Sequence, residues 1–263
     1  MRHLFRRVGL FPALLAACLF AQRVCAREAP PIAAASDLQF ALAEIATAFE
    51  KDGHGEVRLV FGSSGNFARQ IEQQAPFQLF LSADEALVFG LAEKGLMKDR
   101  GALYAVGRIV LFAPKGSPLA GDLSARGLRK AIESGSLKHL AIANPEHAPY
   151  GRAAQEWLTT HDLWEAVQPL LVLGENASQA AQFATVGDSQ GGIIPYSLAL
   201  APRVAENGTF VLLPDDEHEP LRQRMALVKG ASATAEAFYE YLQGKAARDI
   251  MTRYGFVLPD EPR

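Results

Sequence analysis

Two turns that combine serine with small residues are the positions at which this sequence could do chemistry. Ser36 follows the apolar run 32–35, and Ser64 with Gly65 follows the apolar run 57–61; a helical pattern begins directly after each turn. The start of a helix carries N–H groups without intrahelical partners and the positive end of the helix dipole. Together with the serine hydroxyls, such turns predict a site that holds an anion without a cationic side chain.

A structural role also explains the same serines. Serine is an ordinary N-cap residue, whose hydroxyl oxygen accepts a bond from a backbone N–H of the first helical turn. Gly65 favours the anion site, because a residue without a side chain lets a ligand approach the backbone closely. Spacing alone leaves both interpretations open.

Catalytic patterns are missing at the positions where a hydrolase would need them. The segment 62–65, Gly-Ser-Ser-Gly, lacks the glycine that follows a nucleophilic serine by two residues. His147 lies in the proline-containing loop 144–149 and is expected to make a local hydrogen bond, and the glycine-rich segment 187–192 has no Lys-Ser/Thr pair to grip phosphate. Beyond residue 26, the other histidines also lack metal-ligand spacing; they are His54, His139, His161 and His218. We expect no enzyme, with a secreted hydrolase as the alternative from another class.

The elements that must position the serine turns alternate between strand and helix. The predicted strands are 32–35, 57–61, 79–81, 102–114, 140–143, 170–173, 193–195, 210–213 and 225–228, and the predicted helices are 38–53, 67–74, 85–95, 124–133, 151–160, 177–185, 232–242 and 246–253. This order predicts an α/β fold with mostly parallel sheets and functional loops at the carboxyl ends of the strands. The apolar stretch 102–114, with Arg108 inside it, suits a strand that leaves one domain and enters another.

Composition excludes several classes of protein. The chain has 263 residues, 49% of them hydrophobic, with 26 basic and 29 acidic side chains. It can therefore bury a sizeable core, and its scattered basic residues give no source for nucleic-acid binding. Two cysteines are too few for a disulfide scaffold or a zinc cluster.

The first 26 residues have the pattern of a secretory signal. A basic start precedes the apolar run 8–20, which is too short to span a bilayer, and residues 24–26 offer a small-x-small cleavage site. Lipoprotein processing at Cys18 is the alternative, because small residues precede that cysteine. Cleavage after Ala26 would leave a cysteine-free, acidic body suited to the periplasm.

Several segments carry a family resemblance: Ala33–Ser36, Phe61–Ser64, Ala68–Glu72, Leu79–Asp84, Asn144–Gly151, Ala237–Leu242 and Arg253–Phe256. They resemble the periplasmic molybdate-binding proteins of molybdate ABC transporters, from about residue 32 to residue 257. The resemblance implies a two-lobe α/β periplasmic binding protein of type II, with a mixed, mostly parallel sheet in each lobe and the ligand in the interlobe cleft. It also implies capture of molybdate or tungstate and delivery to the permease and ATPase subunits of an importer.

The site residues implied by the resemblance are donors to an oxyanion. Ser36 and Ser64 match the two serines that bind through hydroxyl and backbone N–H. Tyr150 and Ala177 match positions of the second lobe whose backbone N–H groups face the anion. Molybdate is then held as the oxyanion, with no side chain bound to the metal and no cofactor.

Two departures accompany the match. Where many family members have a binding tyrosine after Gly-Ile-Val, this chain has Pro195, and Tyr196 follows one residue later. Either Tyr150 or Tyr196 would then supply a phenol to the ligand. Asp37 is the second departure, because a carboxylate beside a dianion is repulsive; we expect its side chain to point to solvent and to serve the first helical turn.

The predicted donors also indicate which anions the site would select. A fully deprotonated dianion needs donors only, whereas hydrogen phosphate needs an acceptor, and sulfate is excluded by cage size; a sulfate or phosphate receptor is the alternative within the same class. We expect lobe 1 to comprise 32–112 plus 226–263 and lobe 2 to comprise 113–225. The hinge strands would lie near 109–114 and 225–229. We expect a monomer that binds no nucleic acid.

Overall fold

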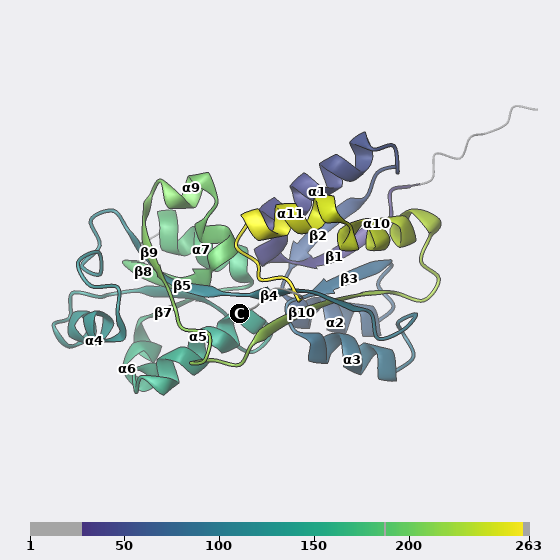
Figure 1. Cartoon of the computed structure of the whole chain (residues 1–263). Helices are drawn as coiled ribbons and strands as arrows, with labels where there is room; N and C mark the ends of the chain where they lie inside the picture. Colours follow the sequence, from purple (N-terminus) through teal and green to yellow (C-terminus); the bar gives the residue numbers. More distant parts are fainter. Residues whose placement is uncertain (1–27, 187, 260–263) are drawn as a thin grey trace, which may run out of the picture.

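Two five-stranded sheets form the centres of two lobes that lie side by side (Figure 1). The computed structural model describes residues 28–186 and 188–259. The predicted signal segment 1–26, with Cys18, lies outside the described residues. Each sheet joins parallel strands at one edge to antiparallel strands at the other. The predicted two-lobe α/β fold is confirmed.

The first sheet is built from the beginning of the chain and one late strand. Its order is β2 (Arg58–Gly62), β1 (Pro31–Ala35), β3 (Leu79–Ser82), β10 (Leu221–Leu227) and β4 (Ala102–Gly107). Strand β1 is parallel to β2 and β3, so the turns after these three strands meet at one end of the sheet. Strand β10 runs antiparallel to both of its neighbours, β3 and β4.

Helices cover both faces of the first sheet, so the sheet has a hydrophobic core on each face. The alternating direction of side chains along its strands supplies residues to both cores. Helices α1 (Gln39–Lys51), α10 (Ala233–Gln243) and α11 (Lys245–Arg253) lie on one face, and α2 (Ser64–Glu72) and α3 (Glu85–Glu93) lie on the other (Figure 1). Ile32 and Ala34 of β1 belong to the core of the first group, whereas Ala33 belongs to the core of the second. Successive side chains of a strand point to opposite faces, so β1 must be apolar throughout.

The second sheet contains the middle of the chain. Its order is β7 (Leu171–Gly174), β6 (Leu140–Ala143), β8 (Gly191–Pro195), β5 (Ile109–Pro114) and β9 (Gly208–Leu212). The flanking helices are α4 (Ala125–Glu133), α5 (Pro149–Thr160), α6 (Trp164–Val167), α7 (Ala177–Val186), α8 (Tyr196–Ala199) and α9 (Pro202–Ala205). Their apolar faces and the strands share one core, in which Trp157 is fully buried.

The crossing between the lobes differs in detail from the prediction. The apolar stretch 102–114 is two strands, because β4 belongs to the first sheet and β5 to the second, with Arg108 between them. The Arg108 guanidinium donates to the Leu213 carbonyl at 3.2 Å. The return crossing precedes Leu221, where β10 begins. The predicted lobe boundaries after residues 112 and 225 therefore cut through β5 and β10.

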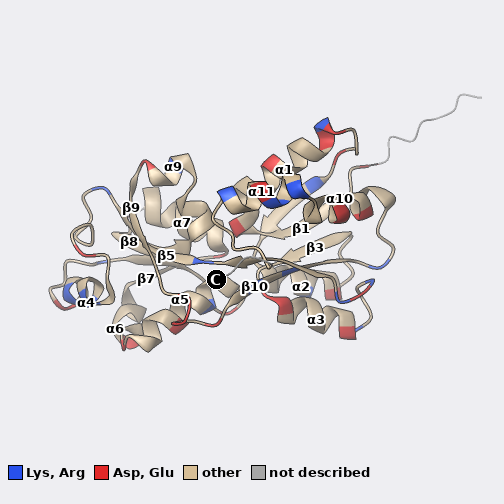
Figure 2. Ribbon diagram, in the orientation of Figure 1, with Lys and Arg blue, Asp and Glu red and all other residues tan. Residues whose placement is uncertain are grey.

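Charged side chains of both signs are interspersed over the outer helices and loops (Figure 2). None of the helices within residues 28–186 and 188–259 is long and apolar enough to cross a membrane.

Candidate ligand-binding site

The first residues of three helices and of one 3-10 turn line a single small cavity between the two lobes. Ser36 opens the turn η1 (Ser36–Leu38), Ser64 opens α2, Tyr150 is the second residue of α5, and Ala177 opens α7. The cavity also meets Ala35, Asp37, Gly62, Ser63, Ala83, Ala148 and Pro149. The structure thus brings together four of the five predicted site residues. A larger cavity, about 720 Å³, lies between α1, α7 and α9 and meets none of the predicted site residues.

Ser36 connects the two lobes at the edge of this cavity. It is 2% exposed and follows directly on β1. Its hydroxyl oxygen accepts a hydrogen bond from the Ser178 N–H at 3.1 Å, and its carbonyl oxygen accepts one from the Ser178 hydroxyl at 2.8 Å. Because a hydroxyl can donate while it accepts, the Ser36 proton is not used by these bonds and can be donated to a ligand.

Ser64 has the same property, and neither it nor Ser63 caps helix α2. The buried Ser64 hydroxyl accepts from the Ala83 N–H at 3.0 Å, so its proton also remains available. Ser63 occupies the N-cap position, but its side chain makes no capping bond. The residues that cap helices of this protein through their side chains include Asp84, Ser124 and Ser232. The N-cap interpretation of the turn 63–65 is therefore wrong.

Tyr150 and Ala177 bring backbone N–H groups from the second lobe. Both lie in the first turn of a helix of ten or more residues, where an N–H has no intrahelical acceptor. The helix dipoles of α5 and α7 add partial positive charge at the same place. Three helix starts therefore favour an anion in the cavity, although no Lys, Arg or His lines it among the described residues.

The two candidate phenols do not reach the cavity in the same way. The Tyr150 hydroxyl donates to the Asp37 carboxylate at 2.9 Å, so it is turned to a neighbouring side chain. Tyr196 is half-buried outside the lining, where its ring packs against Phe210 at 5.8 Å between centroids. Pro195 pairs with Ile109 in the second sheet and does not line the cavity.

Asp37 is buried, contrary to the expectation that its side chain points to solvent. It is 1% exposed, and its Oδ2 accepts hydrogen bonds from Tyr150 and from the Gln223 amide at 2.7 Å. The same amide donates to the Tyr150 hydroxyl at 2.9 Å, and the Tyr104 hydroxyl donates to the amide oxygen at 2.7 Å. Burial raises the pKa of Asp37 to about 6, although the Gln223 and Tyr150 bonds oppose the shift.

Gln223 and Tyr104 are site residues that sequence reasoning missed. Gln223 stands in β10 between two charged residues and is fully buried, and Tyr104 stands in β4. Both lie far from Asp37 along the chain, and an isolated glutamine in a charged stretch carries no sequence signal. Strand β10 pairs with β4 with a register shift after Gln223, which leaves Tyr104 unpaired in the ladder, and its hydroxyl bonds to the Gln223 amide oxygen.

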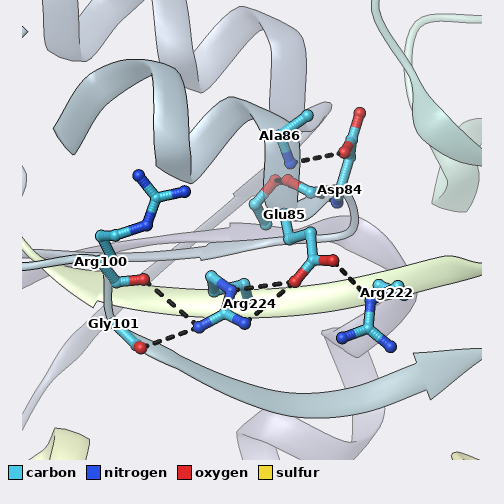
Figure 3. A network of polar contacts seen from close by, with 8 residues as sticks. Asp84, Glu85, Ala86, Arg100, Gly101, Arg222 and Arg224 are labelled. Atoms are coloured by element: carbon cyan, nitrogen blue, oxygen red, sulfur yellow. Dashed lines mark hydrogen bonds and ion pairs between the residues drawn. The ribbon is translucent and has the colours of Figure 1, made fainter. Parts of the chain in front are cut away.

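A cluster of ion pairs holds the strand that carries Gln223. Glu85, at the start of α3, accepts from Arg222 and from Arg224, and Arg224 also donates to the Gly101 carbonyl at 2.9 Å (Figure 3). Alternation along β10 directs Arg222 and Arg224 to one face and Gln223 to the other. The cluster therefore fixes the register in which Gln223 meets Asp37.

His147 and Gly65 make contacts across the cleft that the sequence did not predict. The Gly65 N–H donates to the His147 carbonyl at 2.9 Å, and a Cβ on Gly65 would lie 2.7 Å from the same oxygen. The His147 ring bonds to the Ser63 hydroxyl at 3.0 Å and lies 3.5 Å from the Glu175 carboxylate. Gly65 thus allows a close approach of the second lobe, and the His147 bond is not local.

Further polar contacts hold the lobes together around the cavity. Arg152 of α5 pairs with Asp84 of the first lobe. The Ser197 hydroxyl of α8 donates to the Asp37 carbonyl at 2.9 Å. The lobes are therefore in contact with each other around the cavity, and the predicted donors of both lobes line the same small space.

Within residues 28–186 and 188–259, no group of three or more His, Cys, Asp or Glu side chains is arranged so that it could hold a metal ion.

Comparisons with known proteins agree with this geometry. A family model described as bacterial extracellular solute-binding protein matches residues 31–257. Molybdate-binding protein ModA of Rhodobacter capsulatus is 36% identical over 79% of each chain, and that of Azotobacter vinelandii is 35% identical over 89% of this chain and 92% of the relative. The solved periplasmic molybdate-binding protein of Azotobacter vinelandii superposes with a TM-score of 0.79 at 27% identity, over 88% of this chain and 100% of that one.

The predicted resemblance is confirmed. The family consists of extracytoplasmic transport proteins rather than enzymes. This chain belongs to the bacterial extracellular solute-binding proteins and, among them, to the family of periplasmic molybdate-binding proteins.

Proposed function

We propose that this protein captures molybdate, and with it tungstate, in the cavity between its lobes and delivers the anion to an ABC importer. The observation that carries the proposal is the convergence of three helix starts and the turn η1 on one cavity. The relatives named molybdate-binding protein support the choice of anion.

The donors of the site are the Ser36 and Ser64 hydroxyls and the backbone N–H groups of the first turns, including those of Tyr150 and Ala177. Each hydrogen bond to a charged group is worth about 1.5–3 kcal/mol. A handful of them, desolvated between closed lobes, supports tight binding after the cost of closure. The site needs no cofactor and performs no reaction on its ligand.

Transport follows from closure of the lobes. The anion bridges donors of both lobes, so its binding favours the closed form. We propose that the closed monomer, located in the periplasm, presents its outer surface to a membrane permease whose ATPase drives import.

A second candidate ligand is an oxyanion that carries its own proton, such as hydrogen phosphate. The buried Asp37 carboxylate favours it, because an ionised carboxylate is an acceptor and lines the same cavity. Molybdate offers no proton to such an acceptor.

Calorimetric titration of the purified mature chain tests the proposal. We expect one-to-one binding of molybdate and of tungstate, with no heat from sulfate or phosphate and a thermal shift that follows the same order. Binding of phosphate alone would keep the fold and replace the ligand, and silence towards all four anions would contradict the receptor function.

A further inference from the structure

The Asp37 carboxylate is half satisfied. Its two side-chain donors, the Tyr150 hydroxyl and the Gln223 amide, both bind the Oδ2 atom, at 2.9 and 2.7 Å. The backbone N–H groups of Asp37 and Leu38 also face the carboxylate and lower its pKa, but less than burial raises it. The Oδ1 atom is buried and has no partner among the described residues. A buried carboxylate oxygen without a partner is costly as an ion, and as a hydroxyl it would be a donor.

The groups that face Asp37 from each neighbouring element give it no positive charge. They are Tyr150 from α5, Tyr104 from β4 and Gln223 from β10, while Ser197 of α8 bonds to its backbone. Burial raises the pKa of both tyrosines well above the ordinary value, so they stay neutral. His147, which bonds to Ser63 of the cavity lining, is turned to Glu175.

A deprotonated oxyanion in this cavity adds two negative charges beside Asp37. Ser36 and Asp37 are adjacent residues, and both line the cavity. The bound oxyanion and an ionised Asp37 carboxylate would therefore repel each other, with no cation between them among the residues that line the cavity. A like charge in a poorly solvated site disfavours ionisation of a carboxyl group. The protein can relieve the repulsion by protonating Asp37, because Oδ2 keeps both hydrogen bonds and Oδ1 is free to take the proton.

We propose that Asp37 is a specificity-determining residue of this site: it takes up one proton from solvent on Oδ1 when the deprotonated oxyanion binds, and it rejects that anion while it is ionised. The inference rests on the proposed function. Protonation of Asp37 couples anion binding to proton uptake. The neutral carboxyl group completes a site made of donors, whereas the ionised carboxylate disfavours binding of a dianion.

Calorimetry with molybdate in two buffers of different ionisation enthalpy measures the proton directly on the unmodified protein. At pH 7 we expect uptake of close to one proton for each anion bound. We expect the Kd for molybdate to rise about fivefold from pH 6 to pH 7 and about tenfold from pH 7 to pH 8, because the unliganded protein, in which the pKa of Asp37 is about 6, loses the proton that the complex keeps.

The variant Asp37→Asn distinguishes proton uptake by Asp37 from proton uptake by other groups in the cleft. Its amide oxygen can accept from Tyr150 and Gln223, and its amide nitrogen places a donor where the proton of Oδ1 would be. We expect this variant to bind molybdate at pH 8 about as tightly as the unmodified protein binds it at pH 6, with no proton uptake. The matched control, Asp216→Asn on an exposed loop, should keep the full pH dependence.

The outcomes are distinguishable. Molybdate binding with a constant Kd from pH 6 to pH 8 and no proton uptake would overturn the inference and leave the proposed function intact. A pH dependence that persists in Asp37→Asn would assign it to another group, such as His147, and would also overturn the inference. Absence of molybdate binding at every pH would overturn the proposed function and the inference together.

Discussion

Asp37 couples the stability of the ligand-free protein to pH. Its pKa is about 6 in the folded protein, because burial disfavours the charged form, and about 3.9 in an unfolded chain. The folded state therefore holds more protons between these values, and stability falls as the pH rises from about 4 to about 6. The full penalty, present above pH 6, is at most about 3 kcal/mol.

Denaturation of the ligand-free Asp37→Asn variant measures this penalty. At pH 7.5 we expect the variant to be more stable than the unmodified protein by about 1–3 kcal/mol, and at pH 4 we expect the two to be equal within error. A stability difference of the same size at both pH values would show that ionisation of Asp37 is not its source. Asp216→Asn serves as the exposed control.

The serines of the site could be predicted from the sequence, but the environment of Asp37 could not. A serine between an apolar run and a helical pattern is a local signal, and the family resemblance singled out Ser36 and Ser64. The burial of Asp37 depends on Gln223, which is more than 180 residues away along the chain. An aspartate in the first turn of a helix is most often exposed there, so the local pattern pointed to solvent.

At the scale of elements, the serines at the N-termini of helices α4 and α2 have different functions. Ser124 caps α4 by accepting from the Gly127 N–H at 3.2 Å, whereas Ser64 opens α2 beside the cavity. We expect Ser64→Ala to raise the Kd for molybdate by roughly 10- to 150-fold, the equivalent of one charge-assisted hydrogen bond. Ser124→Ala should cost about 1 kcal/mol of stability and leave the Kd unchanged. Equal Kd values for the two variants would show that the Ser64 hydroxyl does not bind the anion.

The apolar runs of the sequence predicted most of the strands. The predicted strand boundaries were wrong where an apolar run does not reveal with which sheet each part of it pairs. The stretch 102–114 was predicted to cross from one domain to the other, but it is apolar on both sides of Arg108, so nothing local shows that it is divided into two strands of different sheets. Strand β10 was predicted to begin at Met225, because Arg222 and Arg224 interrupt the apolar pattern. Both arginines instead lie on the face that meets Glu85, and β10 begins at Leu221.

At the scale of the whole molecule, closure depends on a glycine of the first lobe. A Cβ at Gly65 would lie 2.7 Å from the His147 carbonyl oxygen of the second lobe, whereas a Cβ at Gly90, in helix α3, meets no atom within 4 Å. Gly65→Ala should therefore obstruct the closed form while it leaves the first lobe intact.

We expect Gly65→Ala to weaken molybdate binding by at least about tenfold, because the anion then has to be bound by lobes that close incompletely. Small-angle scattering should show less compaction on addition of molybdate than in the unmodified protein. The matched control Gly90→Ala should gain about 0.5–1 kcal/mol of stability from the better helix former and bind molybdate normally. Normal affinity and normal compaction in Gly65→Ala would mean that the contact between residue 65 and His147 is not part of the ligand-bound state, and that the lobes meet around the anion elsewhere.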